Sequence, residues 1–275
     1  GSNLAPLLFL IFINDIVDVI SSEKLLFADD LKLYREIISA KDCEILQADV
    51  NSFINWCIQN RLFFNYSKCY SMTFIRKQNH VFYSYKIEDT PLNRSSHIKD
   101  LGIFFDQKLT FADHIGEIVT TSFKMYGFIY RNCRDFTNMD ALFKLFFALV
   151  RSRLEYGSLI WYPIYYKVHI IYTESVQRPF LKFVYCLQNH NFLQRGYDQS
   201  LLLSKFNFNS LRTWRVILTI KFLVDLVKGQ IDCPYLFEKL NFLVPRMNSR
   251  QSFTFYCGTS RTNILRKSPV SNMCN

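Results

Sequence analysis

Apolar residues recur along this chain with helical spacing over long stretches, and these stretches predict most of its elements. Residues 4–19 are apolar around nearly the whole helical circumference, which predicts a helix buried on several sides. Residues 40–60 place apolar side chains at steps of three and four, as an amphipathic helix does. Similar patterns predict further helices, with Asn138 as a start signal and Gly229 as a stop signal, at residues 112–133, 139–153, 170–187 and 210–228.

Short apolar runs before residue 106 predict strands. Residues 24–28 and 31–34 are two such runs, so Asp29 and Asp30 fall at or near the turn of a hairpin. Further strands are predicted at residues 62–65, 71–76, 81–87 and 97–105. Strands gathered in the first part of a chain and helices in the second are typical of an α+β fold.

The two aspartates at this turn are the first candidates for chemistry. Adjacent carboxylates repel each other, and a divalent cation relieves that repulsion. Mg²⁺ prefers oxygen ligands and commonly takes one or two carboxylates together with substrate phosphates, which is the chemistry of two-metal nucleotidyl transfer. On the dipeptide alone, a solvated turn is the simpler interpretation, because aspartate is common in turns.

Composition and charge narrow the class of protein. Hydrophobic residues make up 49% and charged residues 20%, which excludes an intrinsically disordered chain. The net charge of +10 favours an acidic partner, with nucleic acid the leading candidate, although a basic surface alone identifies none. The longest uncharged runs are too short to cross a bilayer. The eight cysteines show no C-x-x-C or zinc-finger spacing, so we expect reduced thiols in an intracellular protein, nuclear or cytoplasmic.

The segments around the paired aspartates extend into a longer pattern. Residues 1–16 read GSNLAPLLFLIFINDI and residues 27–30 read FADD. Their order and spacing resemble reverse transcriptases of non-LTR, LINE-like retrotransposons, nearest the jockey-like group, where the pieces run roughly Q-G-S-x-L-G-P-L-L-F-x-x-x-I-N-D-I and F/Y-A-D-D. Further family-like positions follow in the same order: Leu46-Gln47, Trp56-Cys57, Asn60, Leu62, Asn65, Lys68-Cys69, Leu101-Gly102, Asp106, His114-Ile115, Tyr156-Gly157, Trp161, Pro163, residues 245–250 and Ser268-Pro269.

The resemblance implies an RNA-directed DNA polymerase. Such an enzyme adds deoxynucleotides, from deoxynucleoside triphosphates, to a DNA primer on an RNA template, with Mg²⁺ or Mn²⁺ as cofactor. The resemblance makes Asp29 the direct catalytic metal ligand and Asp30 a weaker, supporting candidate. Gly1 and Ser2 fall where the family contacts nucleotide and template, and Lys68 falls where it approaches the nucleotide phosphates. A solvent-facing turn lysine is an equal alternative for Lys68.

The resemblance also divides the chain into three parts. Residues 1–106 correspond to an incomplete palm, residues 107–240 to a helical thumb and connection, and residues 241–275 to a basic tail. Cations suited to the phosphates of a bound RNA–DNA duplex are expected on the thumb at Lys124, Arg131, Arg134 and Lys144, with Arg151 and Arg153 nearby. A solvated helix face is the alternative for each of these six.

Asp100 and Asp106 repeat the spacing of the family's first catalytic motif. That motif lies upstream of FADD in the family, whereas these two residues lie downstream of it. We therefore assign them to the family's primer-grip region and not to the metal site.

Two functions of different class stay open. The first is a fragment of a polymerase, which we expect to be inactive alone because the fingers and the first catalytic aspartate of the family are missing. The second is a non-catalytic nucleic-acid-binding relic or co-opted protein. In either case we expect salt-sensitive, sequence-independent binding to nucleic acid. We also expect poor solubility, because an incomplete palm leaves an apolar helix and a sheet edge uncovered.

Overall fold

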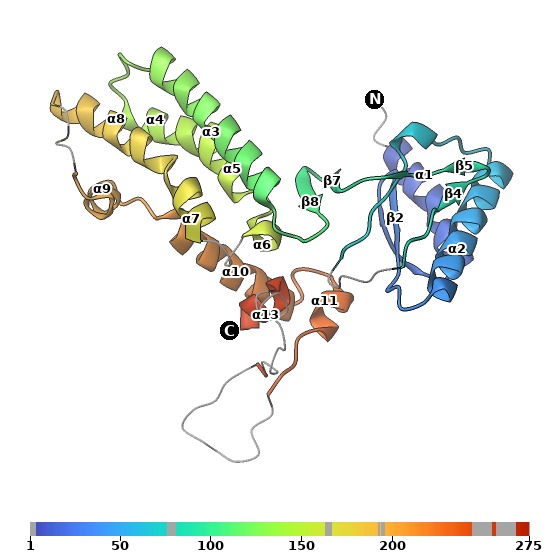
Figure 1. Cartoon of the computed structure of the whole chain (residues 1–275). Helices are drawn as coiled ribbons and strands as arrows, with labels where there is room; N and C mark the ends of the chain where they lie inside the picture. The colour runs from blue at the N-terminus through green and yellow to red at the C-terminus, as the bar shows by residue number, and fades with distance from the viewer. Residues whose placement is uncertain are drawn as a thin grey trace. The chain divides into compact units, whose positions relative to one another are not determined.

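The chain is described here by a computed structural model in which two compact units are distinguished. The described residues are 4–75, 81–162, 167–191, 193, 196–243, 255–256 and 268–274. Of these, 58% are helical and 12% lie in strands, so the predicted α+β class is confirmed. Unit 1 comprises Gly1–Lys99 and Phe105–Leu109, and unit 2 comprises Asp100–Phe104 and Thr110–Asn275 (Figure 1).

Unit 1 combines two helices with several two-stranded pairings. Its elements are α1 (Leu4–Ile13), the 3₁₀ helix η1 (Asn14–Val19), β1 (Glu23–Phe27), β2 (Asp30–Tyr34), α2 (Ala40–Gln59), the 3₁₀ helix η2 (Tyr66–Lys68), β3 (Tyr70–Ser71), β4 (Lys86–Ile87), β5 (Thr90–Pro91) and β6 (Asn93–Arg94). The strands β7 (His97–Asp100) and β8 (Ile103–Asp106) pair with each other, and the turn that joins them belongs to unit 2.

One apolar core holds the β1–β2 hairpin against the helices of unit 1. Its buried members come from α1, η1, the residue after η1, and α2: Ile13, Ile16, Ile20, Trp56 and Cys57. From the hairpin, Leu26, Leu31 and Leu33 pack against this core. The opposite face of the hairpin is open, since Leu25 and Phe27 are 57% and 60% exposed. The hairpin is therefore supported from one side only.

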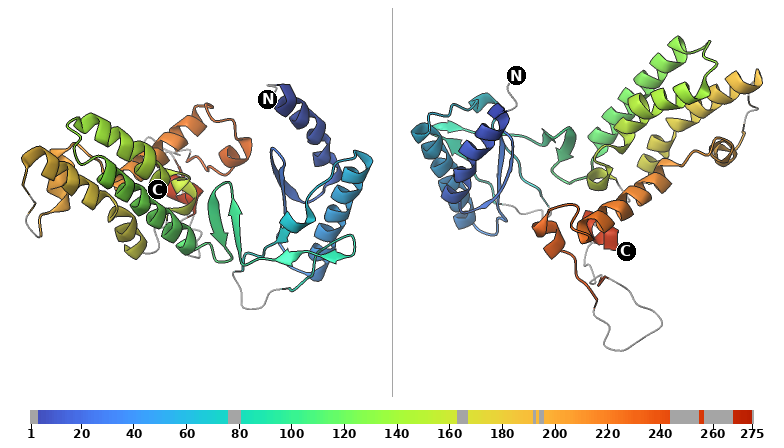
Figure 2. Two further views of the ribbon diagram at one scale, coloured as in Figure 1. Left: turned by 90° about the horizontal axis from the view of Figure 1, so that it is seen from above. Right: turned by 180° about the vertical axis from the view of Figure 1, so that it is seen from behind.

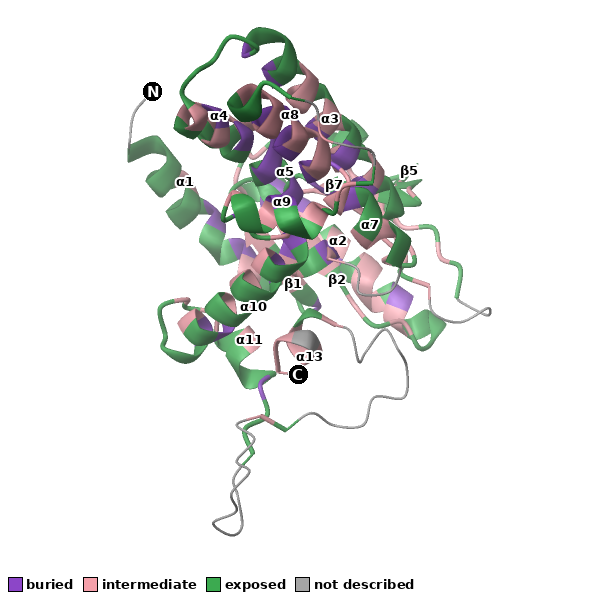
Figure 3. Ribbon diagram, turned by 90° about the vertical axis from the view of Figure 1, so that its left-hand side faces the viewer, coloured by how far each residue is buried: buried purple, intermediate pink, exposed green. Residues whose placement is uncertain are grey.

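The prediction that residues 4–19 are buried on several sides is wrong for α1. Ile13 is the buried residue of this helix, whereas Leu7, Leu8 and Ile11 are more than half exposed. Figure 3 shows α1 exposed along most of its length. The physical reason is that one side of the helix packs on the core and the described residues supply no cover for the other sides.

Several predicted strands are shorter than expected. Of residues 62–65 none forms a strand, although their alternation holds: Leu62 and Phe64 pack on the core while Phe63 is 95% exposed. Strand β3 covers two residues, and of the predicted strand at residues 81–87 only β4 forms. Alternation sets which side chains face inward, but a strand also needs a hydrogen-bonding partner, and here the pairings span two residues.

The described residues of unit 2 are helical or irregular, apart from those at the β7–β8 turn and the isolated bridge between Phe242 and Phe255. Its elements are α3 (Ala112–Asn132), α4 (Met139–Phe146), the π-helical segment η3 (Phe147–Arg151), α5 (Ser152–Glu155), α6 (Ser158–Trp161), α7 (Lys167–Glu174), α8 (Gln177–Asn189), α9 (Gln199–Lys205), α10 (Leu211–Val227), α11 (Pro234–Glu238) and α13 (Pro269–Cys274). Within the described residues, no helix is both long and apolar enough to cross a membrane.

The helices α3, α4–η3–α5 and α8 lie side by side and enclose the core of unit 2 (Figure 2). The rings of Phe146 and Phe180 stack there with their centroids 3.9 Å apart. As predicted, the side chain of Asn138 caps α4 and Gly229 follows α10 with a positive φ of 69°. The helix predicted at residues 170–187 is instead split into α7 and α8. The reason is Pro179, whose ring would clash with the carbonyl of the residue four before it in a continuous helix.

The carboxylate of Asp49 fixes the segment that leads into β1. Asp49 lies on α2 and accepts hydrogen bonds from the backbone N–H groups of Ser21 and Ser22, both at 2.8 Å, and from the hydroxyl of Ser21. Burial by itself raises the pKa of Asp49, but the hydrogen bonds from Ser22 and Ser21 outweigh it and hold the pKa below its ordinary value. The ionised carboxylate therefore stabilises unit 1.

We expect Asp49→Asn to lower the free energy of unfolding of unit 1 by about 2 kcal/mol at pH 7, because an amide offers one acceptor where two N–H groups donate. A carboxylate with a lowered folded-state pKa stabilises above its unfolded pKa of about 4 and loses that contribution as the pH falls. The difference between wild type and variant should thus shrink below about pH 4. Hydrogen exchange of the α2 amides measures it.

Asp18→Asn, at an exposed carboxylate on η1, is the matched control and should change little. An equal loss in both variants, or a difference between wild type and Asp49→Asn that persists unchanged to pH 3, would contradict the role given to Asp49.

Candidate active site

The paired aspartates lie at a two-residue hairpin turn, as the sequence predicts. Phe27 pairs with Asp30 across the hairpin, so Ala28 and Asp29 form the turn and Asp30 begins β2. Ala28 has a φ of +52°, in the left-handed region that a residue with a Cβ adopts at a cost of about 1 kcal/mol. Both aspartates are exposed. The turn therefore presents two adjacent carboxylates to solvent from a backbone with little freedom.

The strand that leads into this turn is anchored at its other end. The ammonium group of Lys24, near the start of β1, donates to the backbone carbonyls of Val17 and Ile20, at 2.5 and 2.6 Å. Both carbonyls lie at the C-terminal end of η1. A cation is favourable at the end of a helix because the last carbonyl groups have no helical hydrogen-bond partners. This contact and the hydrogen bonds from Ser21 and Ser22 to Asp49 together fix the base of the hairpin from which Asp29 and Asp30 project.

A second hairpin in unit 1 has the same local geometry. Glu88 and Asp89 join β4 to β5, and Glu88 has a φ of +53°. Its carboxylate accepts a hydrogen bond from the hydroxyl of Tyr66 at 3.3 Å. A left-handed first residue is therefore a property of these short turns and does not by itself mark a site. It also makes Asp89 an internal comparison for Asp29.

The carboxylates at the β1–β2 turn are the type of ligand that a hard cation prefers, but two of them are fewer than such a cation needs. Carboxylate oxygens suit Mg²⁺ and Mn²⁺. Yet among the described residues no group of three or more histidines, cysteines, aspartates or glutamates is placed to hold a metal ion. Asp29 and Asp30 thus offer part of a ligand set, and a site for two ions would need further oxygen ligands.

The other predicted nucleotide contacts are not assembled around the aspartates. Lys68 is exposed in the last turn of η2, and in the described part of the chain it makes no ion pair with Asp29 or Asp30. Its neighbour Asn65 caps η2 by accepting from the backbone N–H of Ser67. Gly1 and Ser2 lie outside the described residues. Their proposed roles, like that of Lys68, stay predictions.

The predicted phosphate-binding cations are exposed in unit 2, with one exception. Lys124 and Arg131 lie on α3, Arg134 follows it and Lys144 is in the last turn of α4, and all four are exposed. Arg151 is buried, so the prediction that it meets phosphates is wrong. It lies in η3 at the interface between helices, where it donates to the carbonyl of Asn209 at 3.0 Å and contacts the Glu155 carboxylate.

Family-like positions that are far apart in sequence converge around the β7–β8 turn. The hydroxyl of Tyr156 donates to the carbonyl of Leu101 at 2.8 Å, and the indole N–H of Trp161 donates to the carbonyl of Tyr156 at 2.7 Å. The rings of His114 and Trp161 meet edge to face, 5.3 Å apart. We call the set Leu101, Gly102, His114, Tyr156, Gly157 and Trp161 the turn-docking cluster.

The two glycines of the turn-docking cluster are required by close approach as well as by conformation. A Cβ on Gly157, whose φ is +60°, would lie 2.5 Å from the Ile103 side chain. A Cβ on Gly102, whose φ is +83°, would lie 3.3 Å from the Tyr156 ring. These contacts fit the β7–β8 turn against the helices. Close packing within unit 2 therefore explains why glycine stands at both positions.

A second buried arginine, Arg215, packs against the turn-docking cluster. Arg215, on α10, lies over the rings of Trp161 and Tyr162 and donates to the carbonyl of Leu154 at 3.0 Å. Burial lowers the pKa of Arg215 from its ordinary value, although Tyr162 and Glu174 act in the opposite direction. The helical spacing of the sequence gives no indication that Arg151 and Arg215 would be buried.

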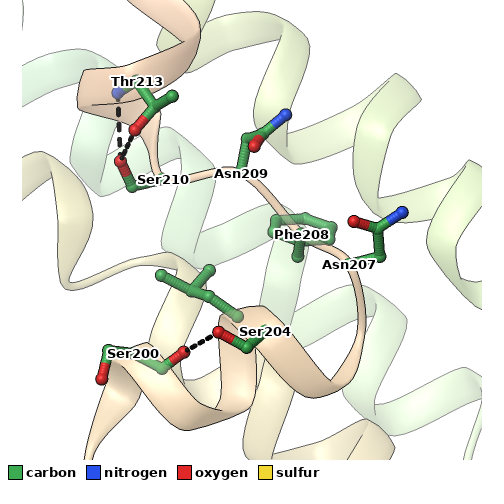
Figure 4. Close-up of a pocket in the computed structure, with 8 residues that line it drawn as sticks. Ser200, Ser204, Asn207, Phe208, Asn209, Ser210 and Thr213 are labelled. Atoms are coloured by element: carbon green, nitrogen blue, oxygen red, sulfur yellow. Dashed lines mark hydrogen bonds between the residues drawn. The ribbon is translucent and has the colours of Figure 1, made fainter.

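A polar depression of about 350 Å³ lies between α9 and the start of α10 (Figure 4). Its lining is mostly hydroxyl and amide side chains, and none belongs to the predicted site: Ser200, Leu203, Ser204, Asn207, Phe208, Asn209, Ser210 and Thr213. Ser210 accepts from the backbone N–H of Thr213 at 3.0 Å and so caps α10. This hydrogen bond of Ser210 therefore serves to cap the helix.

Comparisons with known proteins place this chain in no family. No protein-family model matches it, and no solved structure matches it. An uncharacterized protein of Caenorhabditis elegans is 28% identical over 137 residues, which is 50% of this chain. The alignment spans 66% of that relative's length, just under two thirds. The description of the relative assigns it no activity.

We expect Gly157→Ala to destabilise unit 2 by roughly 2 kcal/mol, because the added Cβ meets Ile103 and the backbone is left-handed. Gly116→Ala is the matched control. Gly116 lies inside α3 with no atom within 4 Å of an added Cβ, so alanine should stabilise by about 1 kcal/mol through helix propensity. Urea unfolding followed by Trp161 and Trp214 fluorescence compares the two. A Gly157→Ala variant as stable as wild type would refute the packing role.

Proposed function

We propose that this chain is part of an RNA-directed DNA polymerase of the non-LTR retrotransposon type and that the β1–β2 turn is its share of the active site. The observation that carries the proposal is the projection of Asp29 and Asp30, both exposed, from a hairpin whose base is anchored by buried contacts. The order of family-like motifs from residue 1 to residue 163 supports it. In this proposal unit 1 contributes to the palm, and the helices of unit 2 form the thumb and connection.

Asp29 and Asp30 have unequal roles in this proposal. Asp29 sits in the turn itself and is the direct ligand for Mg²⁺, whereas Asp30 begins β2 and supports the site. When bound, the ion offsets the negative charge that develops on the phosphoryl group during nucleotidyl transfer. The residues of this chain bind and orient the ion, and the fixed backbone at Ala28 limits where their carboxylates can point.

A complete site needs a further carboxylate in this proposal. In the resembled family it comes from a strand that precedes the segment matching residues 1–16. Neither Asp100 nor Asp106 takes that place, because both lie on the β7–β8 hairpin, downstream of FADD. We therefore expect this chain alone to extend no primer with either Mg²⁺ or Mn²⁺.

The second candidate function is nucleic-acid binding without catalysis. It is favoured by the exposed cations of unit 2 and by the incomplete ligand set among the described residues of unit 1. The two proposals differ in what they require of Asp29. Catalysis depends on that carboxylate, whereas binding to RNA, DNA or their hybrid duplex does not.

The test joins this chain to the upstream fingers and palm segment of a close family member and measures primer extension on an RNA template. We expect the fusion protein to extend the primer and Asp29→Asn to lower the rate at least about 100-fold, because the variant loses a ligand of the metal that stabilises the transition state. Affinity for an RNA–DNA duplex should change little.

Asp89→Asn, at the geometrically similar β4–β5 turn, is the matched control and should leave extension unchanged. Extension by the unfused chain, or a fusion protein that tolerates Asp29→Asn, would contradict the placement of the active site. A fusion protein that binds duplex but extends no primer in any form would favour the non-catalytic function.

A further inference from the structure

The second half of α3 and the helix beside it contain cations but no carboxylates, and the next carboxylate along the chain is Asp135. From residue 118 to residue 134 the chain contains Lys124, Arg131 and Arg134 and no aspartate or glutamate. Helix α8 packs against α3 and contains none either. The second half of α3 and helix α8 therefore carry positive formal charge only, which favours a polyanion over a mixed-charge protein surface.

Aromatic rings are exposed among these cations. Phe128 lies one helical turn after Lys124 and is 50% exposed, and Tyr130 is 41% exposed. Lys124, Phe128 and Arg131 are spaced by four and three residues, so they lie on one side of α3. Lys124 and Arg131 are about 10 Å apart along the helix axis. We call Lys124, Phe128 and Arg131 the α3 face, whereas Tyr130, two residues after Phe128, lies on another side of the helix.

Two arginines at the end of α3, Arg131 and Arg134, lie against the helix or against one of its aromatic side chains. The guanidinium group of Arg131 would come within 3.3 Å of a Cβ on Gly127, so the glycine leaves room for the arginine to lie along α3. The guanidinium of Arg134 lies 4.9 Å from the centre of the Tyr130 ring. The Tyr130 ring also packs on the ring of Phe183, and the two ring centres are 5.0 Å apart. The space at Gly127 thus positions Arg131 along α3 and limits the freedom that Arg131 would lose on binding a ligand.

We propose that the α3 face binds single-stranded nucleic acid, with a base stacked on Phe128 and phosphates at Lys124 and Arg131. The inference rests on the proposed nucleic-acid function. It adds that the ligand is single-stranded and that the aromatic residue Phe128 contacts a base. Exposed rings between cations are how proteins bind single strands without reading sequence, because every base has a face that can stack. A duplex keeps its base faces covered and can use only the cations.

A lipid surface is the alternative ligand for basic and aromatic side chains. The α3 face has little apolar area to insert, since its one ring, Phe128, stands between Lys124 and Arg131. Interfacial helices instead present a continuous apolar side to the membrane. The arrangement of the α3 face therefore favours a ligand with alternating charge and flat rings.

The test measures binding of the full chain to a fluorescent 20-nucleotide oligothymidylate and to a 20-base-pair DNA duplex by anisotropy. We expect tighter binding to the single strand, weakened about tenfold by Phe128→Leu, with duplex affinity unchanged. Phe128→Trp, which keeps an aromatic ring, should retain the preference. Arg131→Gln should weaken both ligands and reduce the salt dependence of single-strand binding by about 0.7 in log–log slope.

Phe63→Leu is the matched control, because it removes an exposed ring of unit 1 and should change neither affinity. Equal affinity for single strand and duplex, a Phe128→Leu variant that binds like wild type, or one that loses both ligands equally would overturn the proposal. Binding to anionic phosphatidylserine vesicles but not to the oligonucleotide would also overturn it.

The outcome is separable from the polymerase test. Loss of primer extension in the fusion protein with an intact single-strand preference contradicts only the catalytic assignment. Active extension combined with no effect of Phe128→Leu on binding contradicts only the role of the α3 face.

Discussion

Everything that the β1–β2 hairpin can do depends on how the backbone reverses at Ala28 and Asp29. A two-residue connection requires a left-handed residue, and alanine occupies that position at a small energetic cost. The reversal puts Asp29 in the turn and Asp30 at the first position of β2. The core-facing leucines of the hairpin, which are partly buried, and the contacts of Lys24 and Asp49 then determine where the two carboxylates lie.

The comparison with the β4–β5 turn shows which part of this arrangement is specific. Glu88, the first residue of that turn, is left-handed as Ala28 is, so backbone strain alone does not distinguish the two turns. The difference lies in the neighbourhood. The β1–β2 pairing covers five residues and packs on a buried core, whereas the β4–β5 pairing covers two. A long, supported hairpin holds its turn residues more firmly, and a metal ligand requires that.

The family-like positions of unit 2 serve a different purpose. Tyr156, Gly157 and Trp161 hold the β7–β8 turn through two hydrogen bonds and a close glycine contact. Arg215 lies over the Trp161 ring, and Arg151 is buried elsewhere in unit 2. Each of the two arginines contacts aromatic rings and donates to a backbone carbonyl, as a buried cation needs.

The sequence predicts the elements better than it predicts their environments. The β1–β2 hairpin, α2, α3 and α10 follow from periodicity and capping residues, because these signals are local. Strands at residues 62–65 and 81–87 were predicted from alternation alone, and most of them did not form because pairing depends on distant partners. The burial of Arg151 and the exposure of α1 are tertiary outcomes that composition does not encode. The exposure of Phe128 and Tyr130 is likewise a tertiary outcome, although the sequence does show aromatic residues beside cations on α3.

The most direct test of the β1–β2 turn as a metal-ligand site is a Mn²⁺ titration followed by nuclear magnetic resonance of the backbone amides. A paramagnetic ion broadens the signals of nearby amides even when it binds weakly. Broadening should begin at residues 28–31, be lost in Asp29→Asn and be absent at the Glu88–Asp89 turn. Equal broadening at both turns, or broadening at residues 28–31 that survives Asp29→Asn, would contradict the assignment of Asp29 as a metal ligand.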